Sequence, residues 1–207
     1  NIVAPNPERL LASTTGCSAG KLFLLKLPEL ITETSFDLPM SADSVSHANC
    51  ILCEQSQDGK WLAWGCGNRE LSIVNLETNQ VDFKVEMTGV IYGFRFLNSR
   101  LIGVAGQFEG LRVFDLVSKQ QVVSLGTTHS CGIFVDQSSN SITVGFKDGI
   151  LRSWLIETWQ PTFELRTNES LIESVCQNVD GSLGVSIDEQ SNVVVFSPSH
   201  KLVYGRL

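Results

Sequence analysis

The sequence predicts an all-β fold, a β-propeller of about five four-stranded blades. Two landmarks recur about every 40 residues, which indicates a repeated structural unit. β-Branched and aromatic residues gather in runs of four to seven between turn residues, and no stretch carries an apolar stripe with helical period. The 207 residues are 43% hydrophobic and 18% charged, as in globular chains that bury a core. We therefore expect residues 1–207 to form one all-β domain.

The first landmark is an apolar anchor residue near the end of a short apolar run. Four runs end alike, and their anchors lie 40, 40 and 42 positions apart: Val74, Phe114, Trp154 and Phe196. A spacing this regular over four copies predicts one supersecondary unit per repeat.

The second landmark is a turn dipeptide upstream of each anchor. These dipeptides lie 40, 42 and 40 positions apart: Asp58-Gly59, Asn98-Ser99, Asn140-Ser141 and Asp180-Gly181. Between turn and anchor lie two short apolar stretches, such as residues 61–65 and 71–76, separated by Gly, Asn or Glu. This pattern is typical of strands joined by hairpins, so each repeat is expected to contribute about four strands.

An eroded copy precedes these four. Residues 10–13 and 21–25 repeat the apolar stretches and place Leu25 at the anchor position, 49 residues before Val74. The predicted repeats are thus 1–45, 46–87, 88–126, 127–168 and 169–207. Four-stranded units of this size gain stability by stacking face to face, which a propeller provides. Two arrangements stay open: a five-bladed ring, or an open part of a larger propeller that would need a partner chain or an oligomer.

These residues resemble the WD-repeat family, most clearly in residues 56–68 running on to 71–75. The likeness extends over residues 6–207, and its specificity comes from five aligned copies, each of them degenerate. It implies blades of four strands, usually seven to a propeller, and a role as a binding platform for proteins.

The resemblance also implies a structural pair within a blade. In the family, a His before the innermost strand bonds an Asp in a tight turn six residues before the anchor Trp, and His129, Asp148 and Trp154 match this pattern. The other copies replace these positions, with His47 opposite Asn68, Met87 opposite Phe108, and Glu169 opposite Gln190. We therefore expect apolar packing to hold most blades together and buried polar networks to be few.

By the same resemblance, the residue before each tight turn reaches the partner-binding face. The matching positions are Gly67, Gln107, Lys147 and Glu189. Trp61 and Trp159 are added as candidate contacts, because each follows a turn or an anchor strand and a Trp at an interface contributes strongly to binding.

The function expected from these observations is that of a non-catalytic scaffold that presents loop residues on a propeller rim to protein or peptide partners. The alternative is a five-bladed propeller that binds or hydrolyses carbohydrate. Glycoside hydrolysis requires two carboxyl groups about 5–10 Å apart. The acids that could serve are Asp58, Asp136, Asp180 and Asp188, and none recurs at an inward-facing position.

Composition argues against other classes of partner. The net charge is −7 and the basic residues are scattered singly, so nucleic acid is not expected as a partner. The apolar runs are only as long as strands, so no membrane insertion is expected. Six cysteines lie in apparent strands without a compact framework, which predicts reduced thiols and a cytoplasmic or nuclear protein.

No metal or cofactor site is expected. Cys50 and Cys53 suggest zinc, but on a strand their sulfur atoms would face opposite sides, and no second ligand pair follows. Residues 103–106 contain two glycines but lack the Gly-Lys-Ser/Thr of a phosphate loop. The sequon at residues 168–170 is discounted, because such triplets are frequent by chance.

Overall fold

A computed structural model describes residues 2–6, 9–15, 20–26, 28–38, 52–65, 69–178 and 181–206. Every regular element that these residues form is a β-strand, and the strands make five antiparallel sheets of four strands each. We number these sheets as blades 1 to 5 in chain order. The chain divides into two compact units, which are Asn1–Ile91 with Asn98–Arg100, and Tyr92–Leu97 with Leu101–Leu207.

The first unit holds blades 1 and 2. The strands of blade 1 are β1 (Ile2–Asn6), β2 (Arg9–Thr15), β3 (Gly20–Lys26) and β4 (Ile31–Leu38). The strands of blade 2 are β5 (Leu52–Gln55), β6 (Trp61–Gly65), β7 (Glu70–Asn75) and β8 (Gln80–Glu86).

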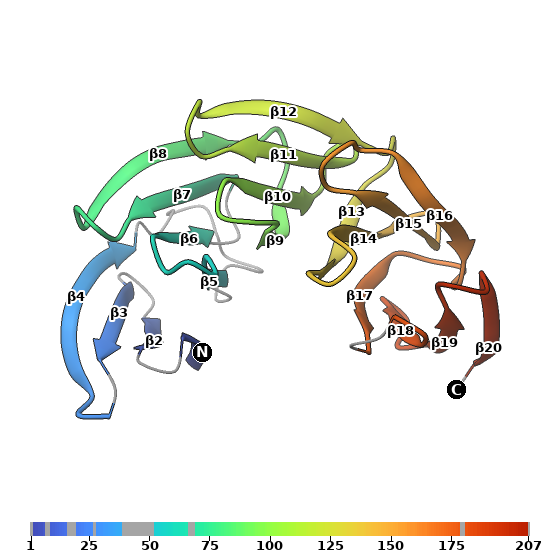
Figure 1. Ribbon diagram of the computed structural model, residues 1–207, viewed down its shortest axis with the longest axis horizontal. Coiled ribbons are helices and arrows are strands. Elements are labelled where there is room, and N and C mark those ends of the chain that lie inside the picture. Colours follow the sequence, from blue (N-terminus) through green and yellow to red (C-terminus); the bar gives the residue numbers. More distant parts are fainter. Residues whose placement is uncertain are drawn as a thin grey trace. The chain divides into compact units, whose positions relative to one another are not determined.

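The second unit holds blades 4 and 5 and all of blade 3 except Ile91 and the turn Asn98–Arg100 (Figure 1). The strands of blade 3 are β9 (Ile91–Phe96), β10 (Leu101–Gly106), β11 (Leu111–Asp115) and β12 (Gln120–Leu125). The strands of blade 4 are β13 (Ser130–Asp136), β14 (Ser141–Phe146), β15 (Ile150–Leu155) and β16 (Pro161–Arg166). The strands of blade 5 are β17 (Ile172–Gln177), β18 (Gly184–Asp188), β19 (Val193–Ser197) and β20 (Leu202–Arg206).

Each blade is a meander in which every strand pairs with the strand that follows it. The four strands of a blade fall within one predicted repeat, and the all-β prediction with four-stranded blades is confirmed. The four anchors all lie on the third strand of a blade and are buried, with Val74 and Phe196 at 0% exposure and Phe114 and Trp154 at 8%. Leu25 takes the same place in blade 1 but is half-buried.

The turn dipeptides lie where the first strand of a blade turns into the second. Asp58 and Gly59 separate β5 from β6, and Gly59 adopts a left-handed φ of 73°. Asn98 and Ser99 separate β9 from β10, and Asn98 caps its turn through its side-chain oxygen, which accepts a hydrogen bond from the backbone N–H of Arg100 (2.8 Å). Gly181 also has a left-handed φ, whereas Asp180 lies outside the described residues.

Blades 3 and 4 pack face to face through a continuous apolar cluster. Blade 3 contributes Ala105, Leu111 and Val113, whose side chains share one face because strand residues alternate between faces. Blade 4 packs against these residues with the face that carries Val144 and Trp154. The Phe146 and Trp154 rings meet edge to face with centroids 6.1 Å apart. This layer excludes water from both sheets.

The same arrangement joins blade 4 to blade 5. Leu151 of β15 packs with Ile172, Val175 and Phe196, and Phe163 of β16 lies against the same cluster. Leu151 and Phe196 are both fully buried. Within the first unit, Leu24 and Phe36 of blade 1 pack with Trp64 of blade 2, with the Phe36 and Trp64 rings 5.4 Å apart.

The described cysteines are thiols. Cys53, Cys131 and Cys176 form no disulfide, while Cys17, Cys50 and Cys66 lie outside the described residues. Burial raises the pKa of the Cys131 thiol to about 12, and its Sγ donates to the backbone carbonyl of Glu173. Across the described part of the chain we find no helix with the length and apolar character needed to cross a membrane.

Truncation in the face-to-face layer should cost much of the stability of the fold. Leu111→Ala and Leu151→Ala each remove a fully buried side chain, so each should lower the free energy of unfolding by about 2–5 kcal/mol. Leu202→Ala removes the same atoms from a side chain that is 55% exposed, and should change it by less than about 0.5 kcal/mol. Urea denaturation of the three variants measures the difference. Equal losses in all three would contradict this role for the blade faces.

Candidate partner-binding site

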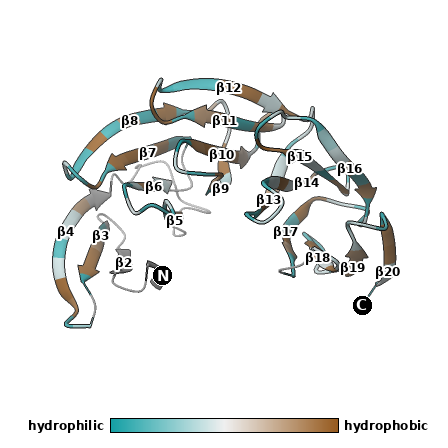
Figure 2. Ribbon diagram, in the orientation of Figure 1, coloured by the Kyte–Doolittle hydropathy of each residue, from teal (hydrophilic) through white to brown (hydrophobic). Residues whose placement is uncertain are grey.

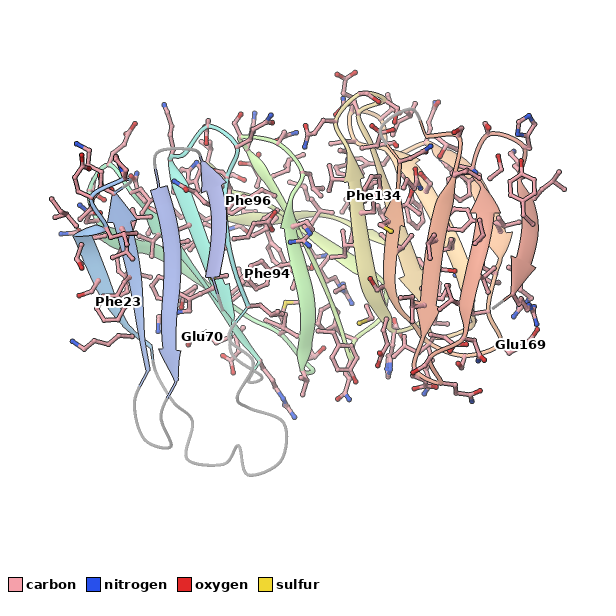
Figure 3. The ribbon with its side chains drawn as sticks, turned by 90° about the horizontal axis from the view of Figure 1, so that it is seen from below. Phe23, Glu70, Phe94, Phe96, Phe134 and Glu169 are labelled. Atoms are coloured by element: carbon pink, nitrogen blue, oxygen red, sulfur yellow. The ribbon has the colours of Figure 1, made fainter. Side chains whose placement is uncertain are left out.

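Three of the predicted rim residues lie at the same end of their blades in the second unit. Gln107, Lys147 and Glu189 directly follow β10, β14 and β18, and all three are exposed. We call the three turns that contain them the Lys147 rim. Figure 3 labels Glu169 at this end of the strands of blade 5, just before β17 begins.

Backbone hydrogen bonds fix the Lys147 and Glu189 turns in place. The N–H of Lys147 donates to the carbonyl of His129 (2.8 Å), and the N–H of Glu189 donates to the carbonyl of Leu171 (3.0 Å). Each bond ties a turn to the start of the innermost strand of its own blade. Side chains on this rim therefore project from an ordered backbone, which lowers the entropic cost of binding a partner.

Gly149 links the rim turn of blade 4 to the connection into blade 5. Its carbonyl accepts hydrogen bonds from the N–H groups of Thr167 and Asn168, both at 3.1 Å. Its φ is +74°, and a Cβ at this position would lie 2.0 Å from the carbonyl oxygen of Asn168. Only glycine combines this backbone conformation with so close an approach.

The exposed side chains of the rim differ in chemistry. The Gln107 amide donates to the Tyr92 hydroxyl, which orients both groups. Within the part of the chain that the structure describes, the ammonium of Lys147 and the carboxylate of Glu189 have no hydrogen-bonded or ion-paired partner. The rim thus presents an amide, a phenol, a cation and an anion, a set suited to polar peptide groups.

Asp148, next to Lys147, is held by an arginine. Both terminal nitrogens of the Arg152 guanidinium donate to its carboxylate, with Nη2 2.8 Å from Oδ2 and Nη1 3.2 Å from Oδ1. Arg152 also bonds Glu164 through Nε (3.1 Å) and lies 4.9 Å above the Phe146 ring. Burial lowers the pKa of Arg152, but the hydrogen bond and charge of Asp148 and Glu164 outweigh burial and raise it above its ordinary value.

The prediction that His129 bonds Asp148 does not describe this carboxylate, which is bonded by Arg152 instead. Among the described residues, the donors to the Asp148 side chain are Arg152 and the N–H of Ile150. His129 is half-buried and contributes its backbone carbonyl to the Lys147 turn. Trp154 is buried in the layer between blades 3 and 4. His129, Asp148 and Trp154 thus lie in or next to the strands of blade 4 that support the Lys147 rim.

Blade 5 contains a buried polar network that the sequence did not reveal. Asp188 accepts hydrogen bonds from the side chains of Asn192 (3.0 and 3.1 Å) and Asn168 (3.3 Å). Asn168 in turn accepts from the Ser186 hydroxyl (2.7 Å), and these three partners of the network, Asn168, Ser186 and Asp188, are at most 2% exposed. Since Asn168 is buried, the sequon at residues 168–170 presents no accessible amide.

Within the described ranges, the groups that stabilise the Asp188 carboxylate are hydrogen-bond donors of Asn192, Asn168 and Gln190. Burial raises the pKa of this carboxyl, but the bonds from the Asn192 side chain and from the N–H groups of Asn192 and Gln190 outweigh burial and hold the pKa below its ordinary value. The separation of 20 residues between Asn168 and Asp188 is close to that between His129 and Asp148. This spacing was the sequence signal that could have revealed the network. The sequence analysis placed Glu169 and Gln190 at the two positions instead, and therefore missed Asn168 and Asp188.

The predicted tryptophans do not share the Lys147 rim. Trp159 follows β15 at the opposite end of blade 4, where it is half-buried against the cluster of Trp154 with a left-handed φ of 57°. Trp61 begins β6 in the first unit and is also half-buried. Its backbone N–H donates a hydrogen bond to the Ser56 hydroxyl (2.9 Å). Gly67 lies outside the described residues.

The carboxylates considered for glycoside hydrolysis lie apart in the second unit. Asp136 ends β13 and Asp188 ends β18, which places them at opposite ends of the strands. Asp136 is bonded to the hydroxyls of Ser138 (2.7 Å) and Ser139 (2.6 Å). Asp180 lies outside the described residues, and those residues contain no group of three His, Cys, Asp or Glu that could hold a metal ion.

Comparison with solved structures identifies the fold. The chain matches the β-propeller domain of Cps50 (Swd1) from Myceliophteria thermophila, at a TM-score of 0.71 and 14% identity, over 92% of this chain and 62% of that one. It matches a chain of the Mitotic Checkpoint Complex, at a TM-score of 0.73 and 12% identity, over 96% and 60%. It matches U3-55K, at a TM-score of 0.72 and 15% identity, over 99% and 62%.

These matches show the fold of WD40 β-propellers, as the resemblance in sequence had implied. The chain spans about 60% of the length of the chains it matches. No protein-family model and no curated protein matches the sequence.

The rim turn of blade 4 should depend on its glycine. Gly149→Ala would combine a left-handed backbone with a steric clash against Asn168, so the free energy of unfolding should fall by at least about 2 kcal/mol. Gly205→Ala is the matched control, because a Cβ there meets nothing within 4 Å. Thermal denaturation of both variants decides the matter, and a Gly149→Ala protein as stable as the Gly205→Ala protein would show that the turn is not constrained.

The Asp188 network should make stability depend on pH. Since its folded pKa lies below the unfolded value, Asp188 contributes stability above the unfolded pKa of about 3.9, and this is lost as the pH falls through the folded pKa. Asp188→Asn should reduce stability at pH 7 and flatten its decline between about pH 5 and pH 2.

Urea denaturation as a function of pH measures this slope. Ser186→Ala is the control, because it removes the hydroxyl bond to Asn168 but keeps the carboxyl, so stability should fall by about 1 kcal/mol with the acid decline unchanged. An Asp188→Asn protein with the same acid decline as the unaltered chain would refute the assignment.

Proposed function

From the WD40 propeller fold, we propose that this protein is a non-catalytic interaction scaffold whose Lys147 rim binds a protein or peptide partner. The observation that carries the proposal is the common placement of Gln107, Lys147 and Glu189. Three exposed and chemically different side chains project from these turns, and backbone hydrogen bonds hold the turns of Lys147 and Glu189 in place.

The charges of the rim indicate the kind of partner. Lys147 and Glu189 lie on neighbouring blades and carry opposite charges, so the matching segment would offer an acidic group to blade 4 and a basic group to blade 5. Such complementarity fixes the register of a bound peptide and raises its rate of association. A structure with a similar fold was solved in the Mitotic Checkpoint Complex, which supports protein partners in general.

We place the protein in the cytoplasm or the nucleus. The free thiols of Cys53, Cys131 and Cys176 support a reducing compartment.

Charge reversal on the rim should weaken partner binding. Lys147→Glu should reduce the affinity for the bound protein about tenfold, since removal of a well-used interface charge costs about 1–2 kcal/mol. The matched control is Lys201→Glu, an equal change of charge at the opposite end of blade 5. The partner is first captured from a cell extract by the unaltered chain and identified, and its affinity for each variant is then measured.

Two results would contradict the proposal. One is a partner that binds the Lys147→Glu protein as well as the unaltered chain but is lost with Lys201→Glu, which would place binding on the opposite rim. The other is the absence of any reproducibly captured partner. Restored affinity on reversing the matching charge of the partner would confirm direct contact with Lys147.

A further inference from the structure

A cavity lies between blades 4 and 5, at the end of the strands opposite the Lys147 rim. Its volume is about 390 Å³, within the range of about 300–1,000 Å³ that is typical of ligand pockets. One wall is the turn after Asp136, where β13 ends, whereas the Lys147 rim follows the other end of β14. Among the described residues, all that line the cavity belong to blades 4 and 5, within the second unit.

The strand registers show which residues occupy the same space between blades 3 and 4. Ile102, Ile142 and Gly184 are equivalent, because each pairs with the anchor of its own blade. Between blades 3 and 4, four apolar residues at this end pack against one cluster or form part of it: Leu101, Val113, Val135 and Trp159. Between blades 4 and 5, the equivalent residues all line the cavity: Ser141, Ser153, Gln177 and Lys201.

The cavity is therefore a local replacement of apolar by polar residues. Trp159 and Lys201 both lie five residues after an anchor, with φ of 57° and 53°, so they take the same place in their turns. The Trp159 side chain packs against the cluster of blades 3 and 4, whereas Lys201 lines the cavity. The rest of the layer stays apolar, since Leu151 packs with Phe196 and Figure 2 shows the apolar character of β19.

The inner end of the cavity carries buried hydroxyl groups. Ser153 is 1% exposed, and its hydroxyl has no hydrogen-bond partner in the part of the chain that the structure describes. Its neighbour across the strands, Thr143, is 2% exposed and accepts a hydrogen bond from the Gln177 side-chain amide (3.1 Å). A buried hydroxyl normally has a hydrogen-bond partner, so Ser153 indicates that the cavity binds a polar group.

The wall formed by the turn after β13 presents oxygen atoms whose protons are already used. The hydroxyls of Ser138 and Ser139 both donate to the Asp136 carboxylate, at 2.7 and 2.6 Å. The Ser141 oxygen lies 2.8 Å from that of Ser139, and since the Ser139 proton is bound to Asp136, Ser141 is the donor. All four side chains line the cavity, so this wall offers lone pairs and no free hydroxyl proton.

The same wall carries a negative charge. Burial raises the pKa of Asp136, but the hydrogen bonds from the hydroxyls and N–H groups of Ser138 and Ser139 outweigh burial and hold the pKa below its ordinary value. Its Oδ2 atom faces blade 5, where a Cβ on Gly181 would lie 3.9 Å away. A carboxylate surrounded by hydrogen-bond acceptors favours a cation that carries several N–H donors.

We propose that this cavity binds a guanidinium group, supplied by a small arginine derivative or by an arginine side chain of a partner peptide. A guanidinium has five N–H donors in one plane and stays protonated, which matches a wall of acceptors. Phe163 pairs with Ser153 and lines the cavity, so its ring offers a face on which the planar cation can stack.

Lys201 restricts the rest of the ligand. It lies on blade 5, across the cavity from the wall of Asp136, and its side chain is exposed. An ammonium here attracts a carboxylate or a carbonyl oxygen, so the ligand would carry such a group at the other end from its guanidinium. This site is separate from the Lys147 rim and does not depend on the function proposed for that rim.

NMR titration with Nα-acetyl-L-arginine tests the site. We expect a dissociation constant of about 1 mM, as for small polar ligands, with shifts in the amide signals of Ser138, Ser139 and the Gln177 side chain. Nα-acetyl-L-citrulline has nearly the same shape without the charge, and should bind at least about tenfold more weakly. Equal binding of the two ligands, or shifts confined to other parts of the protein, would overturn the proposal.

Two variants test the residues assigned to the cavity. Asp136→Asn removes the negative charge and should weaken the binding of Nα-acetyl-L-arginine at least about tenfold. Ser153→Val introduces the residue that blade 3 carries as Val113, so it should fill the inner end of the cavity and prevent binding while the melting temperature stays the same or rises. Lys147→Glu is the control, because it changes a charge outside the cavity and should leave this binding unchanged.

Unaltered affinity in the Asp136→Asn protein would overturn the proposal, and so would unaltered affinity in a folded Ser153→Val protein. A pentapeptide with one arginine between glycines, acetylated and amidated at its ends, distinguishes the two sources of the guanidinium. Binding of this peptide with the same shifts assigns the cavity to a peptide partner, whereas binding of Nα-acetyl-L-arginine alone assigns it to a small molecule. Binding of neither would also overturn the proposal. The partner of the Lys147 rim is measured separately, so either proposal can fail without the other.

Discussion

The structure depends on one constraint, that a four-stranded blade has two apolar faces and can cover neither by itself. Leu111 and Leu151 occupy the same register position in neighbouring blades, and each is fully buried by the blade that follows. This constraint explains why the sequence repeats about every 40 residues, and why each copy keeps an apolar anchor while its polar residues vary. Burial between sheets supplies the stability, so the turns are free to differ.

The turns of the Lys147 rim show how the same geometry is reached with different chemistry. In blade 4 a carboxylate beside the turn is neutralised by Arg152, whereas in blade 5 Asp188 is satisfied by amides and backbone N–H groups. In both blades a backbone bond joins the turn to the innermost strand. The residues that hold the rim are therefore distinct from those that it presents. This separation lets Lys147 and Glu189 vary without loss of the fold.

The sequence predicted the blades better than the site. An anchor or a turn residue reflects the needs of its own strand or turn, and these needs recur in every blade. The anchors Val74, Phe114, Trp154 and Phe196 therefore located the third strands correctly. The partner of a buried polar group depends on register between strands that are distant in the chain. The position expected to pair with His129 is bonded to Arg152, and the network of Asn168 was missed because two of its members lie one or two positions from the family pattern. Trp159 was grouped with the rim, but β15 carries the chain to the other end of the blade before reaching it.

The covered blade faces could not have been recognised from sequence either. A strand leucine that is buried, such as Leu151, looks the same in the sequence as one that is exposed, such as Leu202. The pairing register separates the two, because it places Leu151 on the face of blade 4 that packs against Ile172 and Phe196. The blade faces and the proposed rim contacts also obey different physics, since the faces pack through apolar area whereas the rim would bind through charge and hydrogen bonds. Salt should therefore weaken rim binding by screening and leave the packing of the blades almost unchanged.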